Sequence, residues 1–284
     1  MISRYAFDGR KLKTMYEEPW KLRLPAFRVF GNLYFVGNQD GASWLLDCGK
    51  DLILFDTNYP TADTLLIDSI WSLGFDPKKI TAIFHTHGHF DHFGATELLR
   101  ALSGAKVYLG EADVRMFAER PELSCIGDSE NAYLTTFEAD VSVKDGDCFT
   151  FGDTKIRCVA CPGHSPGATS YFFNVTDGER TLTACLHGGA GLNTLCRPYC
   201  EAHGVNWRAD FVASLQSVMD EPVDIFLGNH TPQNDTAGRM DRLMKGEKDA
   251  FVDRSAWRAF LESVLALYEQ MLRDEADGTD MIAY

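Results

Sequence analysis

A short segment in the first third of the chain carries the side chains that bind metal ions. Thr86-His87-Gly88-His89-Phe90-Asp91-His92 has three imidazoles and a carboxylate within six residues. Neutral imidazole and carboxylate are ligands that zinc accepts, and Zn–N distances of ~2.0–2.1 Å require donors that converge on one point. In a turn, His87 and His89 can face one ion while Asp91 and His92 face a second. The segment therefore predicts a metal site.

The elements around this segment are predicted to be strands and helices in alternation. Apolar residues 80–84 form a strand before it, and residues 95–103 form a helix after it that Gly104 ends. Upstream, four short strands are expected at 27–30, 33–36, 44–46 and 52–55. A helix follows them, with Thr61 as its N-cap and Gly74 after its last turn. The histidine-rich segment is thus a turn between a strand and a helix.

The second half of the chain repeats this alternation. Strands are expected at 147–151, 155–160, 170–175, 181–186 and 223–227, and helices at 210–219 and 257–272, the last capped by Asp253. No Pro/Gly/Ser-rich linker separates the elements. The sequence predicts an α/β fold with residues 1–25 as an N-terminal arm and residues 26–284 as one domain.

Composition excludes several classes of function. The 284 residues carry a formal net charge of −14, which disfavours nucleic-acid binding because phosphate backbones are repelled. No apolar run approaches the ~18 residues of a membrane-spanning helix. The first residues lack the apolar segment of a secretory signal, so a cytoplasmic location is expected. The eight cysteines are expected to be reduced and to serve core packing.

The histidine-rich segment resembles the His-x-His-x-Asp-His signature of the metallo-β-lactamase superfamily. Three further motifs follow the order of that superfamily. Leu54-Phe55-Asp56-Thr57 is similar to its strand ending in an aspartate, Pro162–Gly167 to its next histidine loop, and Leu227-Gly228-Asn229-His230 to its final ligand loop. The resemblance covers most of the chain and implies an αββα sandwich with the site along one edge of the two sheets.

The resemblance also implies a site with two zinc ions. Transferred position by position, His87, His89 and His164 would bind the first ion, and Asp91, His92 and His230 the second. Asp56 would hold the ligand loop by hydrogen bonds.

One departure from the superfamily pattern indicates a subclass. Most of its hydrolases have an aspartate between the third and last histidines that bridges the metals. Here no aspartate lies between Asp177 and Asp210. This pattern resembles the third subclass of metallo-β-lactamases, which lacks both a bridging aspartate and a zinc-binding cysteine. His187 stands near the missing residue, so it is a supporting group, a substitute ligand or a histidine that only holds its own loop by a hydrogen bond.

The function implied is hydrolysis. A zinc-bound hydroxide would attack a carbonyl carbon, with Asp91 orienting the hydroxide or taking its proton. The amide of a β-lactam is the leading small-molecule substrate, and a lactone, thioester or other small ester hydrolysed in the cytoplasm is the alternative. A zinc-binding protein without turnover is a third possibility. Specificity is expected to depend on two long loops, Glu119–Glu138 and Ala190–Arg208.

Overall fold

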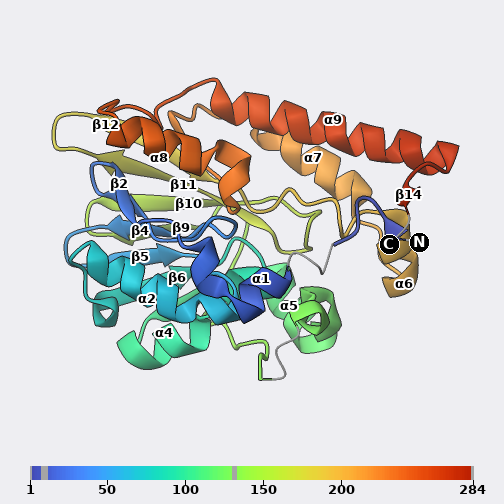
Figure 1. The fold of residues 1–284 in the computed structure, drawn as a ribbon, viewed down its shortest axis with the longest axis horizontal. Coiled ribbons are helices and arrows are strands. Elements are labelled where there is room, and N and C mark those ends of the chain that lie inside the picture. The colour runs from blue at the N-terminus through green and yellow to red at the C-terminus, as the bar shows by residue number, and fades with distance from the viewer. Residues whose placement is uncertain (1, 8–11, 130–132, 283–284) are drawn as a thin grey trace.

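Two β-sheets face each other in the computed structural model, which describes residues 2–7, 12–129 and 133–282 (Figure 1). Within these residues, the larger sheet has the strand order β2 (Phe27–Phe30), β3 (Leu33–Phe35), β4 (Trp44–Asp47), β5 (Leu52–Phe55), β6 (Ile80–Phe84), β7 (Lys106–Gly110), β8 (Val141–Val143). The smaller sheet has the order β13 (Ile225–Leu227), β12 (Thr181–Leu186), β11 (Thr169–Thr176), β10 (Thr154–Ala160), β9 (Cys148–Phe151). A short pair, β1 (Ile2–Ser3) with β14 (Met281–Ile282), joins the two ends of the chain.

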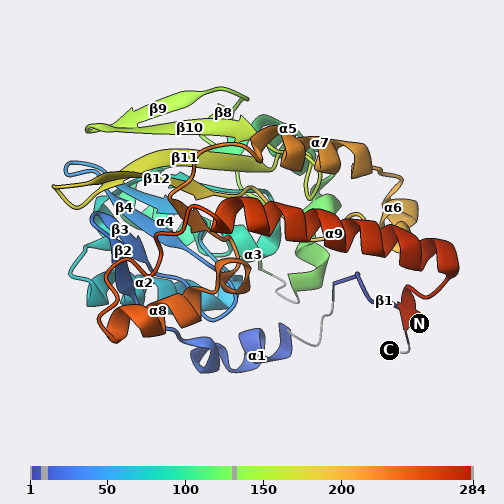
Figure 2. The ribbon, with the colours of Figure 1, turned by 90° about the horizontal axis from the view of Figure 1, so that it is seen from above.

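Helices flank the two sheets on their outer faces (Figures 1 and 2). The first half of the chain contributes α1 (Leu12–Glu17), α2 (Asp63–Ser72), α3 (Phe90–Phe93), α4 (Thr96–Ser103) and α5 (Glu111–Glu119). The second half contributes α6 (Arg197–His203), α7 (Arg208–Val218), α8 (Thr236–Met244) and the long α9 (Ala256–Asp277). Short 3₁₀ helices lie at Pro19–Leu22, Pro60–Ala62, Pro77–Lys79, Pro121–Ser124, Ile126–Ser129 and Thr231–Asn234.

The central core lies between the two sheets and is rich in aromatic rings. Phe55 of β5 stacks on Phe173 of β11, with ring centroids 4.9 Å apart. Phe84 of β6 meets Tyr171 edge-on at 5.4 Å. Each of these rings is buried. Successive side chains of a strand point to opposite faces, so the large side chains of alternate positions fill this inner layer.

Two outer cores hold the helices against the sheets. On the larger sheet, Leu54 of β5 packs in one cluster with Leu66 of α2 and Leu99 of α4. On the smaller sheet, Phe226 of β13 packs in another cluster with Trp257 of α9. Three apolar layers between four structural layers define an αββα sandwich. The predicted fold class is confirmed.

Most predicted strands appear within one or two residues of their expected positions, but two predicted helix caps are wrong. Thr61 lies inside the 3₁₀ turn that precedes α2, where its hydroxyl donates to the carbonyl of Met15 at 2.6 Å. Asp253 lies too far before α9, and its carboxylate accepts hydrogen bonds from the backbone and hydroxyl of Ser255. In both places the polar side chain bonds to another partner, α1 for Thr61 and a local turn for Asp253, and therefore does not cap the helix.

The two segments expected to be long loops contain helices. Pro121–Ser124 and Ile126–Ser129 are 3₁₀ turns, and Arg197–His203 is α6. Residues 130–132 of the first segment lie outside the described residues. The cysteines, all of which are described, form no disulfide, and most are buried. Among the described helices, none has the length and apolar character needed to cross a membrane.

Candidate metal centre

The ligand candidates converge on one edge of the sandwich because of strand direction. β5 and β6 are parallel, so their carboxyl ends meet at the same edge of the larger sheet. Asp56 follows β5, and the segment from His87 to His92 follows β6. From the smaller sheet, His164 lies in the loop between β10 and β11, and His230 follows β13. The structure brings all six predicted ligands together here.

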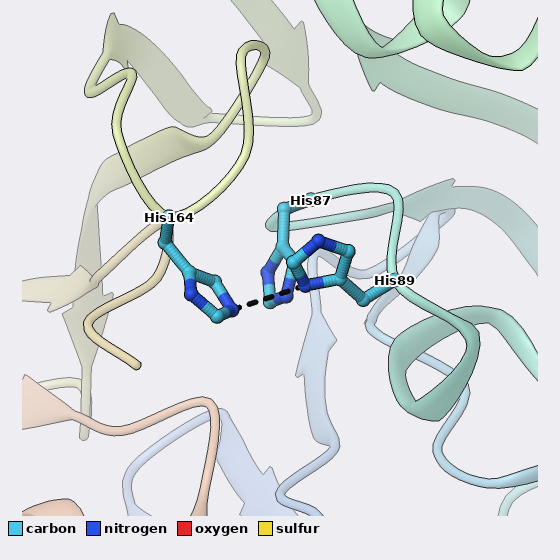
Figure 3. A group of neighbouring side chains, drawn as sticks. All are labelled: His87, His89 and His164. Atoms are coloured by element: carbon cyan, nitrogen blue, oxygen red, sulfur yellow. Dashed lines mark hydrogen bonds between the residues drawn. The ribbon is translucent and has the colours of Figure 1, made fainter. Parts of the chain in front are cut away.

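Three of the histidines, His87, His89 and His164, form the group that we call the first trio (Figure 3). His89 Nδ1 lies 3.1 Å from His164 Nε2. The three ring centroids are each 4.6 Å from the others. Two ligands come from one sheet and the third from the other, so this trio exists only when the sandwich is assembled.

The second trio is Asp91, His92 and His230. Asp91 Oδ2 lies 3.4 Å from His92 Nε2 and 3.4 Å from His230 Nε2. The His92 and His230 rings are 5.0 Å apart. The trios adjoin each other, because the His87 ring lies 4.0 Å from that of His92. A group of possible ligands therefore also joins His87 with Asp91 and His92.

Hydrogen bonds on the far side of each ring determine which nitrogen faces the centre. Asp56 Oδ2 lies 2.8 Å from His92 Nδ1, and a carboxylate accepts, so Nδ1 carries the proton. The carbonyl of Gly191 accepts from His164 Nδ1 at 2.9 Å in the same way. These contacts leave the Nε2 lone pairs of His92 and His164 directed into the centre. Such partners are typical of metal-binding histidines.

Asp56 is the main organiser of the ligand loop, as the sequence predicted. It is fully buried and has φ of 53°, a left-handed conformation uncommon outside glycine. Its two oxygens accept from the backbone and hydroxyl of Thr86 at 2.7 Å each. The Thr86 hydroxyl lies 3.1 Å from His87 Nδ1. Because this hydroxyl donates to Asp56, it is free to accept from His87, which leaves His87 Nε2 for a metal ion.

The donor set fits metal ions on two observations. Among the described residues, His87 Nε2 and His92 Nε2 are buried without a hydrogen-bond partner. Unpaired buried nitrogens are costly unless something absent from the protein chain satisfies them. The donor separations of 3.1–3.4 Å also match the ~3.3 Å expected between tetrahedral ligands with ~2.0 Å metal distances. Two adjoining sites for zinc-like ions fit this geometry.

The two trios differ in their protonation when no metal is bound. Burial lowers the pKa of His164 to about 4, and it holds the pKa values of His87 and His89 well below 6.5. Burial would also lower the pKa of His92, but Asp91 and Asp56 raise it to about 9. Despite its own burial, Asp91 has a pKa held well below 3.8 by His92 and His230. The first trio is therefore neutral and the second is a buried ion-pair cluster.

Asp40 and Tyr59 extend this cluster and were not found from the sequence. Asp40 Oδ2 lies 3.4 Å from His230 Nδ1 and accepts from the Tyr59 hydroxyl at 2.5 Å. Although burial lowers it, the pKa of His230 rises to about 10, because Asp40 and Asp91 flank the ring. Asp40 lies in a loop 190 residues from His230, so no local pattern could have identified it.

Asp113 was also missed. This fully buried carboxylate lies in the first turn of α5, three residues after β7. It accepts from the backbone of Gly88, between His87 and His89. The one available signal was its place after the carboxyl end of a strand parallel to β6.

His187 lies against α9. Its ring centroid is 5.7 Å from that of Trp257 and 5.8 Å from that of Phe260. Its Nδ1 accepts from the backbone of Gly189 at 2.9 Å. Among the described residues, His187 is not part of a group whose ligand atoms lie close enough together to hold one metal ion. Of the three interpretations left open by the sequence, these contacts favour a histidine that holds its own loop by a hydrogen bond.

Replacing His187 by asparagine is expected to leave the metal content of the protein unchanged. The asparagine carbonyl can accept from Gly189 in place of Nδ1, so the loop keeps its hydrogen bond. Activity should fall by less than the roughly 10–100-fold typical of residues that hold metal ligands. Elemental analysis of His187→Asn after zinc saturation checks this. Loss of one zinc ion per chain would make His187 a ligand.

A cavity of about 670 Å³ opens over both trios. Asp91, His164 and His230 reach its floor. Its walls come from segments far apart in the sequence: the N-terminal arm (Arg4–Phe7), the loop 190–193, and α9 through Phe260, Ser263, Val264 and Leu267. Cys125 lines this cavity, whereas Cys161 is buried in the core cluster that contains Phe226 and Trp257, where it accepts from the Ser170 hydroxyl. A cavity of this size and mixed lining accommodates a small organic molecule.

Known proteins resemble this chain in sequence. The sequence model of the metallo-beta-lactamase superfamily matches residues 36–177. A probable metallo-hydrolase of Bacillus subtilis is 25% identical over 225 residues, covering 78% of this chain and 95% of that protein. A hydroxyacylglutathione hydrolase of Maricaulis maris is 33% identical over 115 residues, covering 39% of this chain and 35% of that enzyme. The match to that enzyme thus spans about a third of its length.

Solved structures resemble it over almost the whole chain. The subclass B3 metallo-β-lactamase BJP-1 of Bradyrhizobium japonicum has a TM-score of 0.80 at 25% identity, covering 93% of this chain and 99% of that one. The FEZ-1 metallo-β-lactamase of Legionella gormanii has a TM-score of 0.82 at 26% identity, covering 90% of this chain and 98% of that one. The predicted likeness to the third subclass is confirmed.

Proposed function

The chain belongs to the metallo-β-lactamase superfamily, and we propose that it is a zinc-dependent hydrolase with the amide of a β-lactam as its leading substrate. The observation that carries this proposal is that the two trios meet under one cavity, where His87 lies beside Asp91 and His92. The likeness to metallo-β-lactamases over nine-tenths of the chain supports the choice of substrate.

In this proposal, His87, His89 and His164 hold one zinc ion, and Asp91, His92 and His230 hold another. When bound, zinc lowers the pKa of a water molecule to about 7 and polarises a carbonyl oxygen. Imidazole and carboxylate donors suit zinc better than calcium or magnesium, which prefer oxygen ligands.

Asp91 is the residue to which we assign the proton transfers. Its pKa is held well below 3.8, so it is ionised at neutral pH, and its side chain is 14% exposed toward the cavity. It can orient the attacking water and accept the proton released as the oxygen–carbon bond forms. When the carbon–nitrogen bond of the β-lactam breaks, the proton passes to the departing nitrogen. Water enters and no other co-reactant is needed.

The lack of a bridging carboxylate favours β-lactams in this proposal. In most hydrolases of the superfamily an aspartate lies between the two metals. Here the strand β12 ends at Leu186 and is followed by His187, which packs against α9. The space between the trios is then open to substrate. A bicyclic amide can place its nitrogen and carboxylate there, beside the second trio.

The second candidate is hydrolysis of a thioester or lactone. It is favoured by the match to hydroxyacylglutathione hydrolases. The open space between the trios also accepts such esters, so the substrate, and not the catalytic residues, distinguishes the two candidates. A zinc-binding protein without turnover is less consistent with a cavity that exposes Asp91 to small molecules.

Hydrolysis is expected to require zinc and to include at least one β-lactam. Steady-state assays with a penicillin, a cephalosporin, a carbapenem, a lactone and an acyl thioester test this on the full chain. Dialysis against a chelator should abolish turnover, and about two equivalents of zinc should restore it. Hydrolysis of only the lactone or thioester would establish the second candidate. Two bound zinc ions with no turnover of any substrate would contradict the enzymatic function.

A further inference from the structure

Asp113 connects the two loops that supply the first trio. Its Oδ2 accepts from the backbone of Gly88 and from the hydroxyl of Ser165, both at 2.7 Å. Its Oδ1 accepts from the backbone of Gly167 at 2.7 Å. Gly88 lies between two ligands of the first trio, and Ser165 directly follows the third. One carboxylate thus holds both loops by three short hydrogen bonds.

The backbone is closely packed around Asp113. A Cβ atom added to Gly167 would lie 2.3 Å from the backbone nitrogen of Asp113. A Cβ added to Gly110, at the end of β7, would lie 2.0 Å from the carbonyl oxygen of Gly167. Glycines at both positions allow the start of α5 and the histidine loop to touch through their backbones. Close backbone packing therefore brings the loops together beside Asp113, and the backbone N–H of Thr169 also donates to the carbonyl of Thr86 at 2.8 Å.

Keeping an ionised carboxylate at this position has an electrostatic cost. Asp113 is fully buried, and its partners among the described residues are neutral donors. Burial raises the pKa of Asp113 to about 6, although the three hydrogen bonds oppose this. A buried charge without a cation partner usually has a reason other than stability. A cation held by the neighbouring histidines would stabilise it.

We propose that Asp113 is the positioning residue of the first trio: it holds the His87–His89 loop and the His164 loop at the separation at which their three donor atoms converge. The inference rests on the proposed metal site. Asp56 has the corresponding task for His92. Asp56 also reaches His87 through the Thr86 hydroxyl, whereas Asp113 is the carboxylate that joins the His87–His89 loop to the His164 loop.

Asparagine at position 113 is the sharpest test, because it keeps the shape of the side chain. Whichever way the amide turns, its NH₂ group faces a backbone N–H, that of Gly88 or that of Gly167, and one loop is pushed away. The affinity of the first trio for zinc should fall by about 10–100-fold. Ser165→Ala removes one of the three hydrogen bonds without a new clash and should weaken zinc binding by about 2–10-fold.

Zinc titration against a chromophoric chelator measures each trio separately. In a His230→Ala background only the first trio is intact, and there Asp113→Asn should weaken binding. In a His164→Ala background only the second trio is intact, and there Asp113→Asn should change the affinity for zinc by less than about threefold. The control is Asp224→Asn, whose carboxylate accepts from the backbone of Thr183 between β12 and β13, far from the ligand loops. It should leave both affinities unchanged.

The outcomes separate this inference from the proposed function. If the unaltered protein binds no zinc, the proposed function itself fails. If the unaltered protein binds zinc and Asp113→Asn binds it with the same affinity, the inference is wrong. Equal losses at both trios also overturn it, because they would mean general destabilisation. If Asp113→Asn does not fold, Ser165→Ala is compared in the same two backgrounds. A loss of zinc affinity at the first trio alone supports the inference, and no loss of zinc affinity contradicts it.

Discussion

Asp91→Asn is expected to reduce kcat/KM by about 10²–10⁴-fold, the range for loss of a general base. The amide cannot accept a proton from water at neutral pH. It is also a weaker ligand than the carboxylate, so the second trio loses its only negative charge. Steady-state kinetics on the substrate hydrolysed best by the unaltered protein, at saturating zinc, gives the measurement.

The control for Asp91 is a second carboxylate of the same cavity. Asp40 lies behind His230 and forms neither an ion pair nor a hydrogen bond with Asp91 or His92. Asp40→Asn should therefore cause a smaller loss, about 10–100-fold, by disturbing His230 alone. Near-normal turnover of Asp91→Asn would refute the proposed proton transfers. A larger loss of kcat/KM in Asp40→Asn than in Asp91→Asn would also refute them.

The affinity of the second trio for zinc is expected to increase by about 10–100-fold for each unit that the pH rises between pH 6 and 8. The reason is competition with protons. Asp91 with Asp56 raises the pKa of His92 to about 9, and Asp40 with Asp91 raises that of His230 to about 10, against the effect of burial. Both rings are protonated below these values, and a metal ion binds only neutral imidazole. One or two protons must therefore leave His92 and His230 when a zinc ion binds.

The first trio should show almost no such dependence. The pKa of His164 is lowered to about 4 by burial, and those of His87 and His89 are well below 6.5. These rings are already neutral at pH 6, so raising the pH removes no competitor. Zinc titrations at pH 6, 7 and 8, with proton release followed in weak buffer, separate the two trios. Equal pH slopes for both would contradict the expectation.

This difference has a consequence for loading of the site. At slightly acidic pH the first trio should fill while the second remains an ion-pair cluster of Asp91 with its two histidines. The buried carboxylate of Asp56 and the partly exposed carboxylate of Asp40 stabilise that cluster when no metal is present. They also hold the same rings in position for the ion that replaces the protons. The protein therefore keeps a folded site in both states.

The sequence determined the features that depend on neighbours along the chain. The spacing from His87 to His92 places four donors in one turn, and a strand before it sets their common direction. Alternating apolar residues indicated that β9 and β10 are strands, and short apolar runs indicated β5 and β6, because a strand buried on both faces is apolar throughout. The order of the four motifs indicated the αββα sandwich. The subclass followed from one absence, that of an aspartate between Asp177 and Asp210.

Only the tertiary structure decided how distant segments act on the site. Asp113 reaches Gly88 and Gly167, which are 25 and 54 residues away, through hydrogen bonds that exist only when β7 lies beside β6. Asp40 meets His230 because the two sheets share an edge. The direction of the His187 ring depends on α9, which no local pattern relates to β12. Side-chain contacts over such separations depend on packing in three dimensions, and hydrophobic periodicity does not predict them.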